Sequence, residues 1–269
     1  MSDAARGFLA LGVLLAAALV TWAVSVMKRD ASIVDALWGP MFVLAALTYG
    51  WPLAGMGERG TLVLALVAAW ALRLTVYVLA RNHGRGEDYR YRDIRRRNEP
   101  NFALKSVYLV FGLQAVLAWL ISMPLFVAVT SSRPPNVLDA IGAGLVGFGL
   151  VFESVADWQL AQFRRDPANR GEVLSHGLWR NSRHPNYFGE ACVWWGFGVI
   201  AVAAGGGWAL ASCALITWLL LRVSGVALLE QTIATRRPGY AAYVQRTSAF
   251  VPWPRRKLAC GGGSAEAEV

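Results

Sequence analysis

The sequence is poor in the residues that hold disulfide-rich domains and metal centres together. Its 269 residues include three cysteines, Cys192, Cys213 and Cys260, and three histidines. Cys192 and Cys213 lie inside long apolar runs, which indicates apolar packing rather than a disulfide framework. No cluster of Cys and His has the spacing of metal ligands, so we expect no metal site.

Charge is also scarce, and this determines the class of protein. Only 16% of the residues are Asp, Glu, Lys or Arg, whereas 56% are hydrophobic. The charged residues separate apolar runs of about 20 residues, the length of a helix that crosses the hydrocarbon core of a bilayer. Such a helix satisfies its own backbone hydrogen bonds in lipid. The sequence therefore predicts an all-α integral membrane protein, a bundle of about seven transmembrane helices.

The expected spans follow the apolar runs. They cover residues 7–26, 34–53, 61–81, 104–129, 138–163, 186–204 and 208–232. The first run is long and lacks a clear cleavage site, so we interpret it as a retained helix. We expect one membrane domain over residues 1–258 and a disordered tail over 259–269, because the tail is rich in Gly, Ser, Ala and Glu.

The net charge of +9 at pH 7 is distributed unevenly. Most of the 26 Lys and Arg residues fall on one side of the membrane if the spans alternate, in the segments 28–29, 81–97, 164–183 and 236–257. The opposite side has Arg6, Arg59 and Arg133. The positive-inside rule then predicts an N-terminus outside and a C-terminus in the cytoplasm. Topology explains the basic charge, so nucleic acid is not an expected partner.

Ionisable residues inside a span are costly, so they indicate a cavity or partners for one another. Arg73, Tyr77 and Arg81 lie at intervals of four and share one face of the third span. Glu153 and Asp157 likewise share a face of the fifth span. Two neighbouring carboxylates in a low dielectric need cationic or hydrogen-bonding partners. This face therefore indicates either a structural ion-pair network or a ligand site.

Asp35 opens the second span and allows two interpretations. Ser32 and Asp35 have the spacing of a capping box, in which the carboxylate only caps the helix. Alternatively, Asp35 is a functional carboxyl group.

The densest polar segment covers residues 177–190 (GLWRNSRHPNYFGE), between the fifth and sixth spans. Pro185 suits the first turn of a helix, which puts Asn186 and Glu190 on one face. Arg183 and His184 stand just before that helix start, where anions bind well. The segment predicts a phosphate-binding mouth at the cytoplasmic surface.

This segment resembles the steroid 5α-reductase and sterol reductase superfamily, above all its bacterial branch, whose members carry Arg-His-Pro-Asn-Tyr-x-Gly-Glu in a similar place. Segments 157–164 (DWQLAQFR), 86–91 (GEDYRY), 32–39 (SIVDALWG) and 240–252 also fit. The resemblance implies a seven-helix reductase of a bacterial inner membrane that uses NADPH from the cytoplasmic side. It would reduce the C=C bond of a conjugated enone, foremost the Δ4 bond of a 3-oxo steroid, by hydride transfer and protonation at the α carbon.

The resemblance also implies roles for individual residues. Hydride addition creates an enolate that a hydrogen-bonding acid must stabilise, and the expected catalytic residues are Asp35 and Tyr77. The tyrosine position of the family falls near Trp70 in this chain. The residues expected to bind NADPH are Arg81, Arg85, Asp157, Arg164, Trp179, Arg183, His184, Asn186, Tyr187, Glu190, Tyr240 and Tyr243.

Other functions stay open at this point. An isoprenylcysteine-type methyltransferase is also a membrane helix bundle with an Arg-His-Pro-x-Tyr motif, but it uses S-adenosylmethionine. A reductase of another unsaturated lipid, such as an enoyl thioester, and a lipid-binding protein without activity are further alternatives. No Gly-x-Gly-x-x-Gly fingerprint follows a strand, so a Rossmann domain is not expected.

The expected partners are a hydrophobic small molecule, namely a steroid or a related lipid, and the membrane lipids. Glycines 142, 144, 147 and 149 give the fifth span a smooth face. Such a face allows close helix packing. We expect it to meet a neighbouring helix of the same chain, in a monomer.

Overall fold

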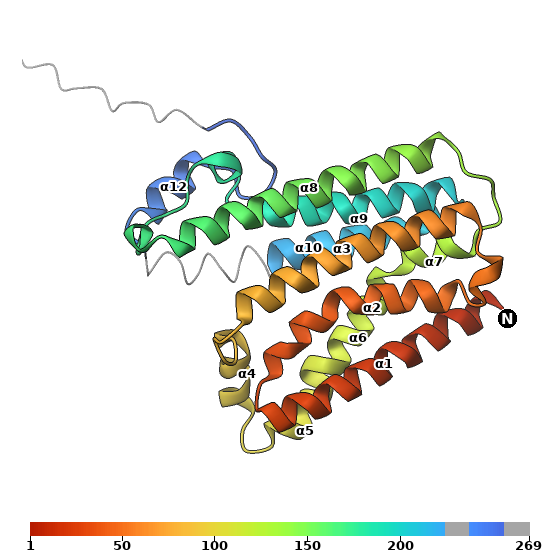
Figure 1. Cartoon of the computed structure of the whole chain (residues 1–269), viewed down its shortest axis with the longest axis horizontal. Helices are drawn as coiled ribbons and strands as arrows, with labels where there is room; N and C mark the ends of the chain where they lie inside the picture. The colour runs from red at the N-terminus through yellow and green to blue at the C-terminus, as the bar shows by residue number, and fades with distance from the viewer. Residues whose placement is uncertain (224–236, 256–269) are drawn as a thin grey trace, which may run out of the picture. The chain divides into compact units, whose positions relative to one another are not determined.

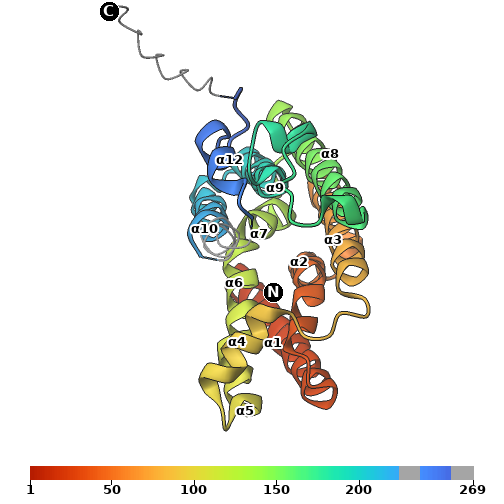
Figure 2. The same ribbon diagram turned by 90° about the vertical axis from the view of Figure 1, so that its left-hand side faces the viewer.

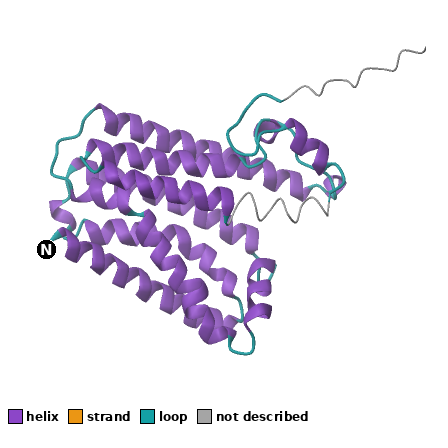
Figure 3. Ribbon diagram, turned by 180° about the vertical axis from the view of Figure 1, so that it is seen from behind, coloured by secondary structure: helices purple, strands orange, loops and turns teal. Residues whose placement is uncertain are grey.

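A computed structural model describes residues 1–223 and 237–255 of the chain (Figure 1). Every regular element in this part of the chain is a helix (Figure 3), and Ser182 and Ser248 form an isolated bridge. The all-helical class is therefore confirmed for the described residues. The end of the run 208–232 and the expected disordered tail 259–269 lie outside them.

Among the described residues, five helical stretches are long and apolar enough to cross a membrane. They comprise α1 (Asp3–Lys28); η1 (Ala31–Ile33) with α2 (Val34–Tyr49); α3 (Glu58–Asn82); α5 (Phe102–Ser106), the π-helical η3 (Val107–Gly112) and α6 (Leu113–Ile121); and α8 (Val137–Arg165). These stretches support a membrane protein and follow the first five expected spans. The total of seven stays a prediction. Polar residues occupy the first turns of α9 (Pro185–Ala203), and α10 (Leu210–Arg222) covers only part of its expected run.

The expected span 104–129 contains a break between two helices. α6 ends at Ile121, and α7 (Met123–Thr130) carries Pro124 in its first turn. Proline has no N–H to donate, and its ring clashes with the carbonyl four residues earlier, here that of Leu120. The Ser212 hydroxyl of α10 donates to this carbonyl at 2.6 Å. A second helix thus supplies the partner that a backbone group in lipid requires.

The chain divides into two compact units. Unit 1 contains residues 1–150 and 191–217. In this unit α2 packs against α1 and α3, and α6 packs against α1 and α2 (Figure 2). The buried rings of Phe42, Trp70 and Trp194 lie with their centroids 4.6–5.5 Å apart. Their contacts form an aromatic centre for the core of unit 1.

Close packing of α8 and α9 in unit 1 depends on two glycines. A Cβ on Gly142 would lie 2.7 Å from the Gly196 carbonyl oxygen, and one on Gly196 would lie 2.8 Å from the Gly142 oxygen. The smooth face of the fifth span therefore meets a helix of the same chain at Gly142, as predicted. A Cβ on Gly144 or Gly147 would meet no described atom within 4 Å, so only part of the glycine stripe is used.

Unit 2 contains residues 151–190 and 218–269, apart from those that the structure does not describe. It holds the end of α8, η4 (Pro167–Asn169), η5 (Gly177–Arg180), the start of α9, and α12 (Tyr240–Arg246). A Cβ on Gly189 would lie 2.7 Å from the backbone nitrogen of Glu153, so α9 begins in close contact with α8. Because α8 and α9 contribute residues to both units, the single domain over 1–258 stays a prediction.

Candidate functional site

The segment 177–190 and the end of α8 bring two of the predicted site residues together. α9 begins at Pro185, as predicted. Asn186 in its first turn donates from Nδ2 to Oδ1 of Asp157 at 3.1 Å. Asp157 is 3% exposed, and the buried Oδ1 of Asn186 accepts no hydrogen bond from any described residue. The pair joins α8 to α9 and leaves a buried acceptor for an incoming N–H or O–H group.

Acidic side chains extend this site along both helices. Glu153 lies one turn before Asp157 on α8, and each side chain is 3% exposed. Glu190 lies one turn after Asn186 on α9 and is also buried. The shared buried face predicted for Glu153 and Asp157 is confirmed. Arg164, predicted to bind the cofactor phosphates, is exposed near the end of α8.

The aromatic residues of the segment pack with one another and with the backbone. The rings of His184 and Tyr187 are stacked, with centroids 5.6 Å apart and 3° between their planes. His184 is 3% exposed. The Trp179 indole N–H donates to the Ala156 carbonyl oxygen at 3.0 Å. These contacts fix the rings of His184 and Tyr187, close to Asn186 in the sequence, and the indole of Trp179.

Arg183 and Tyr243 dock α12 onto the segment. Arg183 donates from Nη1 to the carbonyl oxygens of Val244 (3.2 Å) and Thr247 (2.8 Å), at the carboxyl end of α12. The Tyr243 hydroxyl donates to the carbonyl oxygens of Trp179 (2.5 Å) and Ser182 (3.2 Å). The rings of Tyr240 and Tyr243 lie 5.9 Å apart. Nη1 of Arg183, which was predicted to bind phosphate, therefore holds α12 in place.

Asp35 belongs to a separate cluster in unit 1. Its Oδ1 accepts a hydrogen bond from the Tyr91 hydroxyl at 2.5 Å, and its Oδ2 accepts one from Arg90 Nη2 at 2.8 Å. Arg81 Nη2 lies 3.7 Å from Oδ2. The Tyr91 oxygen in turn accepts from Gln114 Nε2 at 3.2 Å. We call these residues the Asp35 cluster.

The capping interpretation of Asp35 is wrong. The backbone N–H and the hydroxyl of Ser32 both donate to Oδ1 of Asp30, at 2.9 and 2.5 Å. Asp30 therefore caps the start of η1, and no described side chain caps α2. The Asp35 carboxylate is left for Arg90, Tyr91 and Arg81.

Tyr77 lies between two guanidinium groups on α3. Arg73 lies 5.4 Å and Arg81 6.0 Å from its ring centroid, a cation–π arrangement that confirms the shared face of the three residues. Arg85 is exposed beyond the end of α3. Trp70, near which the resemblance puts the tyrosine of the reductases, is fully buried in the aromatic centre of unit 1.

Arg90, Tyr91 and Gln114 were not predicted as site residues, although segment 86–91 contributes to the resemblance. Burial, followed by the negative charge of Asp35, raises the pKa of Tyr91 well above its usual value of 10. Its phenol therefore stays protonated and remains a hydrogen-bond donor. The pairs of Tyr and Arg that open α4 (Tyr89–Asn98) are the sequence signal for this cluster.

Comparison with known proteins gives a family but no activity. The chain is 27% identical over 267 residues to an uncharacterised protein of Schizosaccharomyces pombe, covering 87% of this chain and 76% of the yeast protein. No solved structure matches the chain. Residues 21–247 match a family described as protein of unknown function, DUF1295. The chain therefore belongs to the DUF1295 family of proteins of unknown function.

Proposed function

We propose that the chain is an NADPH-dependent reductase of the C=C bond in a conjugated enone lipid, with 3-oxo-Δ4 steroids as the first substrates to test. The observation that carries the proposal is the hydrogen bond between the buried Asp157 and the half-buried Asn186, within a segment that resembles the steroid 5α-reductases. When bound, NADPH supplies the hydride. The remaining steps require the chain to hold the cofactor and to stabilise charge on the ketone oxygen.

The residues of unit 2 have the chemistry that a nicotinamide nucleotide needs. The open Oδ1 of Asn186 suits the N–H group of a carboxamide, and the carboxylates of Asp157 and Glu190 suit ribose hydroxyls. Arg164 is an exposed residue near the end of α8, and it suits a phosphate because a guanidinium can bind two phosphate oxygens. These groups support a cofactor site on the cytoplasmic side of the predicted topology.

Charge on the ketone oxygen requires a protonated donor. Asp35 and Tyr77 are the catalytic residues that the resemblance implies, and the structure adds Tyr91 as a candidate for the missing tyrosine. Its phenol stays protonated and donates its one O–H to Asp35, so this O–H would turn from the carboxylate to the ketone oxygen when the substrate binds. Stabilisation of an oxyanion by one such donor is typically worth about 2.7–4 kcal/mol.

One observation favours a second candidate, a methyltransferase that uses S-adenosylmethionine. Arg183 donates to two carbonyl oxygens of α12, which reduces the Arg density available for phosphates. S-adenosylmethionine carries ribose hydroxyls but no phosphate, so the Asp157–Asn186 pair also suits it. Cofactor binding distinguishes the two candidates.

The test is the thermal shift of the full-length protein in detergent with NADPH, NADH and S-adenosylmethionine. A ligand that binds the folded state raises the melting temperature. Asn186→Ala should abolish the shift, whereas Asn181→Ala is the matched control, because Asn181 is an exposed residue of the same segment that contributes its backbone carbonyl to Trp253. Oxidation of NADPH is then followed with a 3-oxo-Δ4 steroid and with an enoyl thioester.

A shift with NADPH that is lost in Asn186→Ala and kept in Asn181→Ala supports the reductase. The same pattern with S-adenosylmethionine overturns it in favour of the methyltransferase. An unchanged melting temperature with all three cofactors overturns both and leaves a lipid-binding protein.

A further inference from the structure

A concave site lies in unit 1, at the start of α3. A cavity of about 450 Å³ is lined by Arg6 of α1, by the α2–α3 connection from Gly50 to Arg59, and by the α7–α8 connection from Val129 to Pro135. Arg6, Arg59 and Arg133, the arginines predicted on the side opposite the basic segments, all line this cavity. In the predicted topology the cavity therefore faces away from the cytoplasm. None of these residues belongs to the proposed cofactor site.

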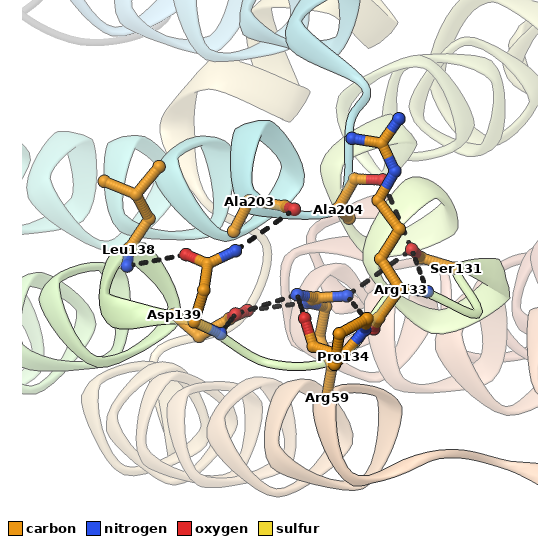
Figure 4. A network of polar contacts seen from close by, with 9 residues as sticks. Arg59, Ser131, Arg133, Pro134, Leu138, Asp139, Ala203 and Ala204 are labelled. Carbon is orange, nitrogen blue, oxygen red and sulfur yellow. Dashed lines mark hydrogen bonds and ion pairs between the residues drawn. The ribbon is translucent and has the colours of Figure 1, made fainter.

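Arg59 forms a wall of the cavity and has no capacity for a ligand. Its Nε and Nη2 donate to the two carboxylate oxygens of Asp139 at 2.6 and 2.8 Å (Figure 4). The other three N–H groups donate to the carbonyl oxygens of Arg133 (2.8 Å) and Pro134 (2.9 Å) and to the Ser131 hydroxyl (3.4 Å). All five donors are used, and Asp139 balances the charge.

Arg6 and Arg133 provide charge that the surrounding protein does not balance. Neither guanidinium forms an ion pair or a side-chain hydrogen bond with a described residue, and Nε of Arg6 is buried. Figure 4 shows the side chain of Arg133 extending away from the Arg59–Asp139 pair. Among the described residues that line the cavity, the exposed Glu58 is the one acidic residue. With the wall neutral, two positive charges face one negative charge.

The backbone adds to this preference for an anion. α3 begins at Glu58, on the wall of the cavity, and its start is capped by no side chain of the described residues. The first N–H groups of a helix and the positive end of its dipole favour anions. The buried donor of Arg6 and the start of α3 therefore favour the same class of ligand.

The surroundings are apolar, as at a membrane surface. Met56, Pro52 and Val129 line the cavity alongside the arginines. Trp51 next to it is 63% exposed, and Leu53 is 42% exposed. Exposed Trp at the end of a membrane span is typical of the headgroup region. A ligand with an oxyanion and an apolar part matches both kinds of lining.

We propose that this cavity binds a phosphate group, with Arg6 as its principal ligand and Arg133 as the second. The phosphate belongs either to the headgroup of an anionic phospholipid or to free phosphate. An arginine fork binds two phosphate oxygens at once, and the first N–H groups of α3, which begins at the cavity wall, can donate to a third. Glu58 on the wall weakens the site, because its negative charge repels the phosphate.

The test measures phosphate binding to the full-length protein in uncharged detergent. The melting temperature is followed during titration with phosphatidylglycerol, with phosphatidylcholine and with inorganic phosphate. Arg6→Gln should weaken the binding of the anion at least about tenfold, or about 1.4 kcal/mol. Arg6→Lys should retain part of it, and Glu58→Gln should strengthen it. Arg97→Gln, an exposed arginine of α4 outside the cavity, is the matched control.

A response to phosphatidylglycerol but not to inorganic phosphate assigns the site to a lipid headgroup, and the reverse assigns it to the free ion. Either result supports the proposal if Arg6→Gln removes it. Equal binding by Arg6→Gln and the unmodified protein, or an equal loss in Arg97→Gln, overturns it. If Arg6→Gln does not fold, two other variants test the proposal. Arg133→Gln should weaken phosphate binding and Glu58→Gln should strengthen it, and no change in either overturns the proposal.

Discussion

Two clusters in unit 1 pair arginine with aspartate, and they differ in how far they are closed to water. The side chains of Arg59 and Asp139 are 2% and 5% exposed, and every N–H of Arg59 has an acceptor. In the Asp35 cluster the side chains of Arg90 and Asp35 are 29% and 16% exposed. Arg81 approaches Asp35 only to 3.7 Å.

The difference separates structural ion pairs from those suited to function. Losing one partner of a closed pair leaves a buried, uncompensated charge, so an exchange of partners would cost several kcal/mol of stability, about 3–5 kcal/mol. An open cluster keeps its charges near water and can exchange an intramolecular contact for a ligand. The two clusters should therefore respond differently to mutation, salt and pH.

The largest effect is expected for Arg59→Met, which leaves the Asp139 carboxylate buried without its cation. We expect a loss of about 3–5 kcal/mol in the free energy of unfolding, measured by denaturation in detergent. The double variant Arg59→Met with Asp139→Leu should recover much of that loss, because no charge is left unpaired. A single variant as stable as the unmodified protein would show that the pair is not closed.

A smaller loss is expected for Asp35→Asn, because its partners can turn to water. Replacing the carboxylate weakens its hydrogen bonds with Arg90 and Tyr91, and we expect a loss of about 1–2 kcal/mol in unfolding free energy. If Asp35 is catalytic, reductase activity should fall far more than this stability change explains. A loss equal to that of Arg59→Met would remove the distinction between the clusters.

Salt should separate the clusters further. The coupling between Asp35 and Arg90, from a double-mutant cycle with Asp35→Asn and Arg90→Gln, should be about 1 kcal/mol or less at low salt. It should shrink in 1 M salt, where the Debye length is about 3 Å. The coupling between Arg59 and Asp139 should remain nearly constant, since neither charge is exposed. Equal salt sensitivity of both couplings would contradict the comparison.

The smallest effect is a response to acid near the Asp35 cluster. Burial opposes the shift, but hydrogen bonds from Arg95 and from the Ala31 N–H lower the pKa of Glu87 below its usual value of 4.5. A lowered folded-state pKa gives stability that is complete above about pH 4.5 and is lost as the pH falls through the folded-state pKa. Melting temperatures measured from pH 6 to pH 3 should therefore fall less in Glu87→Gln, and an identical slope would exclude this contribution.

Much of the helical fold could be predicted from the apolar runs, because span length and hydrogen-bond satisfaction in lipid leave few alternatives. Individual helix faces were also predictable, as with Arg73, Tyr77 and Arg81. The break before Pro124 is encoded in the sequence, but hydropathy alone passes over it. The count of seven helices depends on the expected spans 186–204 and 208–232, whose polar residues make hydropathy a weak predictor.

The contacts of the candidate site residues were less predictable. Asp35 binds residues 55 and 56 positions away, and no local pattern specifies such a pairing. Asp157 and Asn186 were each expected in a site, but their hydrogen bond depends on how α8 and α9 are aligned along each other. The same alignment brings Gly189 into close contact with Glu153. Arg183 was predicted to bind phosphate because its motif places an arginine before a helix start. In the structure its guanidinium instead donates to two backbone carbonyl oxygens.

The hydroxyl of Ser212 also has a consequence for synthesis of the chain. It follows the Leu120 carbonyl by 92 residues, so at about 5–20 residues per second it leaves the ribosome roughly 5–20 s later. During that interval the carbonyl must keep a water molecule or remain outside the hydrocarbon, because an unmet backbone group in lipid costs several kcal/mol. We therefore expect insertion of α6 and α7 to be complete only after α10 arrives. A Ser212→Ala nascent chain should stay bound to the insertase, and remain sensitive to protease, for longer.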